Sequence, residues 1–243
     1  MPITYSAAHV TSPSGTWTTG NISSAATAVT TGQLVVVMWT CGTNASGSVG
    51  TLSISNTGSV GAGLTWTLIG QNSSPSTGNN AKVVAWYAVA ARNENITVTV
   101  NNTGWQDLGR RLTTIVHSGA HATTPVRSFS TAESQATSAS VTITPLQSGS
   151  AMWMLAGDYT AANSATAGTN CSLEGSVFNS TGDFTTAVIR PTTQPRTDSA
   201  AFTLSLSGTS ATWAYIAFEV QAAGSSQSQA PRSMHQLRQR FAQ

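Results

Sequence analysis

The amino-acid sequence predicts an all-β protein, an antiparallel β-sandwich with a jelly-roll-like strand order. Charged residues make up only 7% of the 243 residues, against roughly 25% in an average soluble protein. Ser, Thr, Gly, Ala and Asn stand where helical surfaces would carry Lys and Glu. Thr and Val favour a pleated surface, while Gly, Asn and Ser favour turns. Short strand-like runs recur between clusters of these turn residues, as is typical of a sandwich.

The first strands are predicted from apolar runs and from alternation. Residues 33–41 form an almost continuous apolar run, which indicates a central strand that is covered on both faces. Residues 64–70 and 82–90 follow as strands. In residues 95–101, apolar side chains alternate with Thr, as expected for a half-buried strand. Residues 91–95 form the short connection of an antiparallel hairpin between the last two strands.

The second half of the chain contains further strand-like runs, but they are not similar in sequence to those of the first half. Further strands are predicted over 111–119, 139–146, 150–159, 184–191, 200–208 and 211–221. Residues 160–182 are rich in Ala, Asn, Thr and Ser and indicate a long surface loop, with one short strand around Val177 and Phe178. We find no internal sequence repeat and no change of composition, so we expect one sandwich over residues 1–222.

The composition changes after this domain. Residues 223–231 are Gly, Ser and Gln with little apolar content, which is typical of a flexible linker. Beyond the linker, Ser233 is a candidate helix cap for residues 232–243. Residues up to 224 contain seven basic and eight acidic side chains, whereas residues 225–243 contain three Arg and no acid. The net charge of +2 therefore belongs to the tail.

The tail is predicted to be a docking peptide. Met234, Leu237 and Phe241 fall at spacings of three and four residues, so they form one apolar stripe of a helix. Arg238 and Arg240 lie near the helix C-terminus, where the macrodipole favours positive charge. A helix of ten residues does not hold together alone in water, so these five residues predict contact with a partner. The alternative is a frayed chain end.

Charge and targeting signals exclude several classes of protein. A net charge of +2 is too small to predict a nucleic-acid partner. The first ten residues contain no basic stretch followed by an apolar run, and the longest apolar runs are far too short to span a membrane, so neither secretion nor membrane insertion is predicted. The uncharged surface is typical of a protein held in an assembly or exposed to the outside; a soluble domain with neutral polar groups is the alternative. Cys41 and Cys171 are expected to be buried thiols or a single bridge.

Candidate reaction centres are weak, and we predict no enzyme, no cofactor and no metal site. His117 and His121 lie on a strand end and a turn, with no further His or Cys nearby to complete a metal site. Asp158 and Glu219 stand in apolar strands, where burial would raise the pKa of a carboxyl group. They would need to meet in one cleft to act as the acid and base of a hydrolase.

Aromatic residues beside small polar residues suggest a second kind of site. An exposed Trp face stacks against the apolar face of a sugar ring, while neighbouring amides bind the hydroxyl groups. Trp105 with Asn102, and Trp66 beside Thr residues, are the candidate glycan-binding residues. The alternative is that these Trp side chains pack beneath the loops that close the sandwich.

Two stretches resemble a pattern of β-sandwich virion proteins of tailed bacteriophages. In residues 82–126 a Trp-Tyr strand leads through a hairpin to an alternating Thr/Val strand, and then to an apolar strand that ends in Gly and a Pro-containing turn. Residues 211–223 are similar to the terminal strand of the same proteins. Family members often have an aromatic-Arg-Gly run where this chain has IVHSGA. The matching residues are Trp86, Tyr87, Val98, Val100, Trp105, Ile115, Gly119, Pro125, Trp213, Ile216 and Phe218.

This resemblance implies a structural component of the phage particle that is assembled in the host cytoplasm. A minor tail protein or a capsid decoration protein is implied, present in several symmetric copies and in contact with other tail or capsid subunits. A host surface glycan is a further candidate partner. Under this interpretation the tail fixes an inert sandwich to an acidic groove on a neighbouring subunit.

Overall fold

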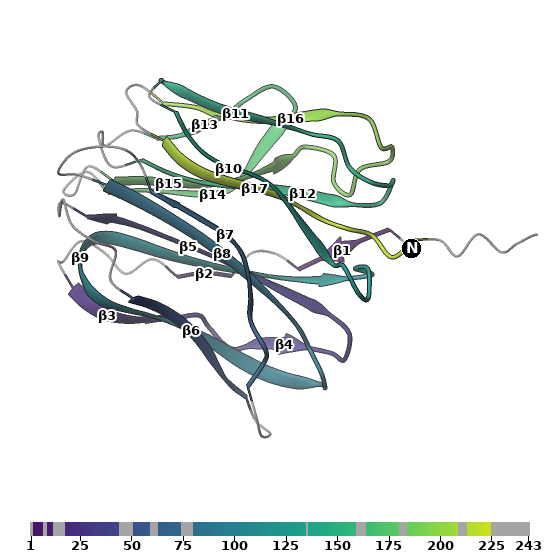
Figure 1. The fold of residues 1–243 in the computed structure, drawn as a ribbon, viewed down its shortest axis with the longest axis horizontal. Helices are drawn as coiled ribbons and strands as arrows, with labels where there is room; N and C mark the ends of the chain where they lie inside the picture. The colour runs from purple at the N-terminus through teal and green to yellow at the C-terminus, as the bar shows by residue number, and fades with distance from the viewer. Residues whose placement is uncertain are drawn as a thin grey trace, which may run out of the picture.

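The computed structural model describes residues 2–6, 9–11, 18–43, 51–58, 63–73, 80–134, 136–158, 164–179, 184–208 and 213–224 (Figure 1). All regular elements of these residues are β-strands, which are paired antiparallel, so the predicted all-β sandwich class is confirmed. Within the described residues, no helix has the length and apolar character that crossing a membrane requires.

The first sandwich, as we call the strands from β1 to β9, has a large and a small sheet. The large sheet has the order β1-β9-β5-β8-β7, with β2 beside β1 on β9. The small sheet consists of β3, β4 and β6 around the first half of β9. The strands are β1 (Thr4–Tyr5), β2 (His9–Thr11), β3 (Thr18–Ser23), β4 (Thr27–Val29), β5 (Leu34–Thr43), β6 (Thr51–Gly58), β7 (Thr67–Ser73), β8 (Asn80–Val89) and β9 (Glu94–Ser118).

The second sandwich comprises the strands from β10 to β17 and has the same layout. Its large sheet has the order β10-β17-β12-β15-β14, and its small sheet has the order β11-β16-β13. The strands are β10 (Val126–Ser134), β11 (Ser138–Ile143), β12 (Ala151–Asp158), β13 (Thr166–Ala167), β14 (Cys171–Asn179), β15 (Phe184–Pro191), β16 (Phe202–Ser207) and β17 (Trp213–Val220).

The two sandwiches are a structural duplication. Along the chain, each sandwich begins with an edge strand of its large sheet, followed by a strand of its small sheet, a central strand of the large sheet and a second strand of the small sheet. An edge strand and a central strand of the large sheet come next. The last two strands lie one in the small sheet and one in the large sheet. In the first sandwich the last two are halves of the single strand β9, and in the second they are β16 and β17. This alternation between sheets is the jelly-roll-like order that was predicted. Residues 1–222 were expected as one sandwich. The duplication within them is not visible in the sequence, because equivalent strands share topology and burial but not residue identity.

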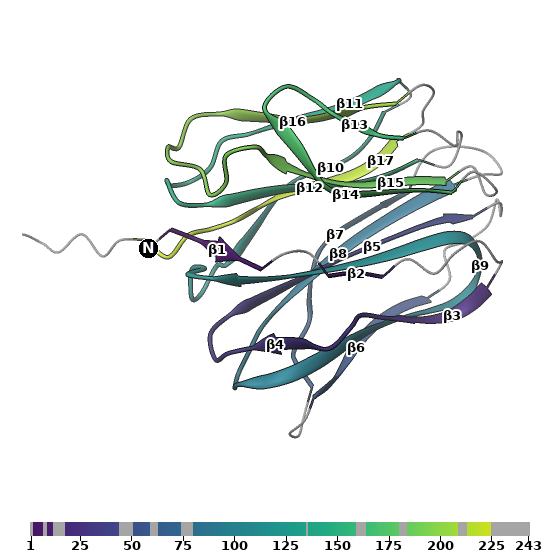
Figure 2. The ribbon, with the colours of Figure 1, turned by 180° about the vertical axis from the view of Figure 1, so that it is seen from behind.

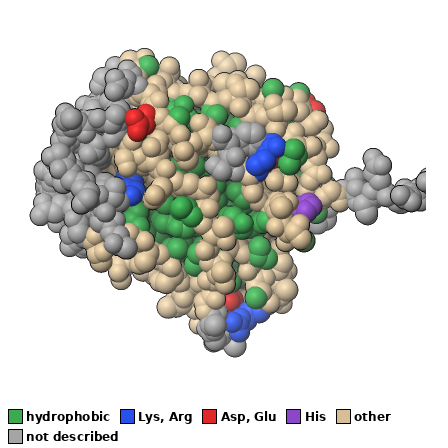
Figure 3. Space-filling view, viewed as in Figure 1, with side chains coloured by type: hydrophobic (Ala, Val, Ile, Leu, Met, Phe, Trp, Pro, Cys, Tyr) green, Lys and Arg blue, Asp and Glu red, His purple; other side chains and the backbone are tan. Residues whose placement is uncertain are grey.

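The sandwiches stack by their large sheets, so the molecule has four layers and three apolar cores (Figures 1 and 2). One core lies inside the first sandwich and includes Trp39 and Val98. A second lies inside the second sandwich and includes Met154 and Leu204. The core between the large sheets holds side chains of both, such as Trp153. Hydrophobic side chains show mainly across the middle of the view in Figure 3.

Burial follows from this stacking. Strands β12 and β17 are buried at every position, because a core covers each face of their sheet. The same is true of residues 34–41 of the apolar run predicted at 33–41, whereas Gln33 is partly exposed. The inward positions Ile96, Val98 and Val100 of the alternating strand are fully buried, as predicted. Residues 160–182, expected to be mainly loop, contain β13 and β14, whose backbone pairs with β16 and β15.

The contacts between the sandwiches follow an approximate twofold relation. The cross-strand registers make Thr40 of β5 equivalent to Gly157 of β12, and Val83 of β8 equivalent to Thr186 of β15. Thr40 Oγ1 donates a hydrogen bond of 2.8 Å to Thr186 Oγ1. In the exchanged pair, a Cβ at Gly157 would lie 3.3 Å from Val83 Cγ1. Equivalent strands of the two sandwiches therefore contact each other reciprocally.

The stack has two different ends. At the terminus end, Ile3 N donates to Gly149 O (3.0 Å), and Ala223 N donates to Gly119 O (2.7 Å), so the first and the last described residues both lie at this end. At the loop end, β5 stops at Thr43 and β12 stops at Asp158. The segments that connect strands at the loop end, 44–50, 74–79, 159–163, 180–183 and 209–212, are rich in Ser, Thr, Gly, Asn and Ala.

Candidate functional site

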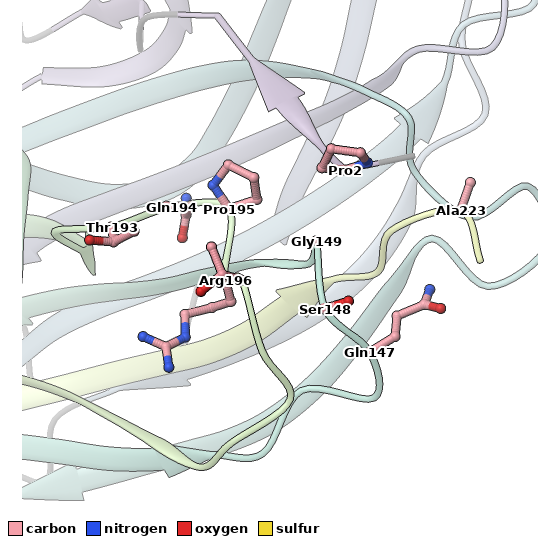
Figure 4. A pocket seen from close by; sticks show the side chains of 10 residues that line it. Pro2, Gln147, Ser148, Gly149, Thr193, Gln194, Pro195, Arg196 and Ala223 are labelled. Carbon is pink, nitrogen blue, oxygen red and sulfur yellow. The ribbon is translucent and has the colours of Figure 1, made fainter. Parts of the chain in front are cut away.

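A pocket of about 700 Å³ lies at the terminus end (Figure 4). It is lined by Pro2, the turn 147–149, the segment 193–197 and Ala223. Figure 4 shows Pro2 and Ala223 on one side of it and residues 193–196 on the other, with Gly149 between them. Pockets that bind small ligands have volumes of about 300–1,000 Å³, so this pocket has the size of a binding site.

Backbone hydrogen bonds join two of the four lining segments, the turn 147–149 and the segment 193–197. Gly149 N donates to Arg196 O (2.6 Å), and Arg196 N donates to Ser150 O (2.9 Å). The side chain of Gln194 contributes a further link, since its Oε1 accepts a hydrogen bond of 2.8 Å from Met152 N. Gly149 has a φ of 87° and meets the backbone of Pro2 at close range, so a larger residue would not fit there. The pocket is therefore rigidly framed by the fold.

The described lining of the pocket is mostly uncharged. Its single charged lining residue is Arg196, whose Nη2 lies 2.8 Å from Asp198 Oδ1 and whose guanidinium carbon lies 4.8 Å from the ring centre of Phe202. The other lining side chains are Pro, Gln, Ser, Thr and Ala. The lining holds no His, Cys, Lys or carboxylate that could act as a nucleophile or general base. No sequence motif indicates this pocket, because its residues come from four separate segments.

The two carboxylates considered for a hydrolase lie far apart. Glu219 is fully buried, accepts a hydrogen bond from Leu146 N (3.0 Å) and lies 2.9 Å from Nη2 of Arg127. Its register partner on β12 is Met152, and Asp158 lies six residues further along that strand. At about 3.3 Å per residue, this places the two carboxylates about 20 Å apart, at opposite ends of the stack. They do not form an acid/base pair.

The two histidines also occupy separate places. His117 is buried between the large sheets, where its Nε2 accepts a hydrogen bond of 3.1 Å from Trp153 Nε1. His121 lies in the connection after β9, and its Nδ1 accepts a hydrogen bond from Thr124 N (3.2 Å). Among the described residues, no three His, Cys, Asp or Glu side chains come together as metal ligands would. Cys41 and Cys171 are both free thiols.

The candidate glycan-binding residues are placed as follows. Trp66 is half-buried against the core of the first sandwich, and its Nε1 donates a hydrogen bond of 3.3 Å to Asn56 Oδ1. Asn102 is only 1% exposed, so its amide is not presented to a ligand at the surface. Trp105 lies in β9, but its side chain is outside the described residues. The structure therefore does not bring these three residues together as one exposed site.

The five predicted docking residues, Met234, Leu237, Arg238, Arg240 and Phe241, lie outside the described residues, as does most of the predicted linker. What the structure does place is their point of departure. Gly224, the last described residue of this segment, follows Ala223 at the rim of the pocket. The tail therefore begins at the terminus end.

No protein-family model, no curated protein and no solved structure matches the chain.

Proposed function

We propose that this chain is a non-enzymatic structural protein of a tailed-phage particle, most simply a minor tail protein, anchored to a neighbouring subunit by residues 232–243. The observation that carries the proposal is the separation of the two ends of the stack. The tail leaves from one end, and the Ser- and Gly-rich connections join strands at the other end. A rigid body with this layout holds one end on an assembly and presents the other. A capsid decoration protein would use the same layout.

The charges of the body support a partner for the tail. Four carboxylates of the described residues already form ion pairs with arginines. These are Glu94 with Arg92, Glu219 with Arg127, Glu174 with Arg190, and Asp198 with Arg196. These pairs leave fewer carboxylates of the body for the basic tail, which supports an acidic complement on another subunit, either a different particle protein or a second copy, as in a symmetric oligomer.

Removing the tail tests this proposal. A chain that ends at Gly224 keeps all three cores, so we expect the same thermal midpoint as the full chain. We expect at least a tenfold loss of the protein from purified particles, measured by immunoblot. Replacing Leu237 and Phe241 together with Ala should give the same loss, because buried apolar anchors dominate such contacts. Replacing Gln236 and Gln239 with Ala is the matched control. Full incorporation of the shortened chain would contradict the proposal.

A further inference from the structure

The small sheets turn faces of Ser, Thr and Asn to the outside on both sides of the stack. In the first sandwich, Ser23, Thr99 and Ser55 form one row across β3, β9 and β6. Asn21, Asn101 and Ser53 form the next row. Their neighbours along the strands, such as Ile22 and Val100, point into the core, so these six side chains point outward. We call them the first hydroxyl face.

The second sandwich has a corresponding face. Ser138, Ser207 and Thr166 form one row across β11, β16 and β13, and Ser140 pairs with Ser205 in the next row. Ala139 and Leu206 beside them point into the core. We call these five residues the second hydroxyl face. Neither face contains a charged or an apolar side chain.

Equivalent positions on the two hydroxyl faces carry similar polar side chains, whereas equivalent positions in the cores carry different residues. The strand registers match Ser23 with Ser140, and Thr99 with Ser205. In the core between the large sheets, by contrast, Val36 corresponds to Trp153. A hydroxyl or amide recurs at five of the six positions of the first face, whereas Ser55 corresponds to Gly168. The pattern therefore occurs in both sandwiches.

The hydroxyl groups are held in place. Ser23 Oγ lies 2.9 Å from Thr99 Oγ1 in the first sandwich, and Thr142 Oγ1 lies 2.8 Å from Thr203 Oγ1 beside the second face. Thr is stiff at χ1, and Ser has a single side-chain torsion before its hydroxyl, so ordering these side chains on a ligand costs little entropy. Neighbouring residues within a row are about 4.8 Å apart, and successive rows are about 6.7 Å apart along the strands. Each face is thus a preorganised lattice of groups that both donate and accept hydrogen bonds.

We infer that the hydroxyl faces bind a neutral polysaccharide. Sugar hydroxyls also donate and accept, so they complement the lattice in both directions. A charged partner would find no opposite charge, and an apolar partner would leave the hydroxyls buried without hydrogen bonds, at a cost of about 1–3 kcal/mol each. A second copy that stacked face to face would lack the apolar side chains with which sheets normally pack. Several copies on one particle would strengthen weak binding by avidity.

Affinity electrophoresis of the full chain tests this inference. Native gels contain dextran, mannan, galactan or a β-1,3-glucan, and we expect at least one of them to retard the protein. Retardation should be unchanged between about 50 mM and about 500 mM salt, because no charges are paired. Ser55→Lys and Ser140→Lys place a charge on an exposed position of each face. Each should weaken retardation several-fold, and the double variant should abolish it.

The control is Ala91→Lys, which adds the same charge at an exposed position outside both faces and should bind as the wild type does. Equal thermal midpoints show that all variants are folded. The inference is overturned if none of the four polysaccharides retards the protein, if Ala91→Lys acts like the face variants, or if binding falls steeply with salt. A wild-type dimer that the double variant dissolves in sedimentation would assign the faces to self-association instead. None of these outcomes bears on incorporation into particles through the tail, so the two proposals fail separately.

Discussion

Trp153 of the second sandwich donates a hydrogen bond from Nε1 to Nε2 of His117 in the first, over 3.1 Å and within the core between their large sheets. The two rings are nearly perpendicular, at 84°. Tyr5 packs edge-on against the same Trp, with ring centres 5.3 Å apart. Because Nε2 accepts the bond, the imidazole is neutral with its proton on Nδ1. This polar link between the sandwiches therefore depends on an uncharged histidine.

The first prediction concerns acid. Burial lowers the pKa of His117 to about 3, against the opposing effect of a backbone hydrogen bond with Leu34, whereas an unfolded histidine titrates near 6.5. The unfolded chain thus binds this proton more readily, so stability is complete above pH 6.5 and falls as the pH drops toward 3. The slope is about 1.4 kcal/mol per pH unit.

Urea unfolding between pH 7 and pH 4 measures this effect. We expect His117→Gln to be less stable than the wild type at pH 7. As the pH falls, however, its free energy of unfolding should decrease less per pH unit than that of the wild type. Carboxylates titrate in both proteins, so the difference between the two slopes isolates the histidine. Parallel slopes would show that His117 is not held neutral.

The second prediction concerns a buried arginine. Arg111 is 1% exposed, and its Nη1 donates a hydrogen bond of 2.7 Å to Gly175 O. Burial lowers the pKa of Arg111 to about 10. A Cβ at Gly175 would overlap with Arg111 Nη2, so Gly175→Ala should destabilise the protein by about 1–3 kcal/mol.

The cause can be isolated by a double-mutant cycle in urea. In an Arg111→Met background the flexible Met side chain can move aside. Gly175→Ala should then lower the free energy of unfolding by less than about 1 kcal/mol. Ser176→Ala, an exposed change at the next residue, is the control and should be nearly neutral. The same cost in both backgrounds would mean that Arg111 does not set the requirement for glycine.

The strands that could be predicted from the sequence are those with a nearly continuous run of apolar residues. The runs 33–41, 150–159 and 211–221 are mostly apolar, because cores cover both faces of β5, β12 and β17. The backbone that joins the halves of β9 was not predicted to be strand, since residues 102–110 are polar. Strand β14 was expected mainly as loop, since it is a Ser- and Gly-containing edge strand whose pairing with β15 is a long-range property.

The duplication and the pocket could not be predicted for a different reason. Packing constrains the combined volume of facing residues more than the identity of each one. Equivalent positions can therefore hold residues as different as Val36 and Trp153, and the sequence shows no repeat. The pocket brings Pro2 to Gly149 and Arg196, which are distant in the chain and carry no recognisable motif. Only the register of the sheets places them together.

The third prediction tests the fit between the sandwiches. A Cβ at Gly157 would lie 3.3 Å from Val83 Cγ1 and 3.4 Å from Ala81 Cβ. Gly157→Val should therefore destabilise the protein by about 1–3 kcal/mol through overpacking. Val83→Ala alone should also destabilise it, by removing buried methyl groups. Combined, the two changes should cost less than their sum, measured by urea midpoints, because the new side chain occupies the vacated space. Strict additivity would contradict the contact.

The fourth prediction compares two ion pairs. Glu219 and Arg127 meet at 2.9 Å, and the Glu side chain is fully buried. Glu219→Gln still accepts the hydrogen bond of Leu146 N but leaves Arg127 without its counter-charge, so we expect a loss of about 1–3 kcal/mol. Asp198 pairs with Arg196 at 2.8 Å, but its side chain is 53% exposed, so Asp198→Asn should cost less than about 1 kcal/mol. Thermal and urea unfolding of both variants at pH 7 and moderate salt measure the contrast.

Salt gives a further control of this prediction. High salt should reduce the cost of Asp198→Asn further and leave that of Glu219→Gln nearly unchanged, since water and ions do not reach the buried carboxylate. Equal costs for the two variants would show that burial of Glu219 does not strengthen its pairing.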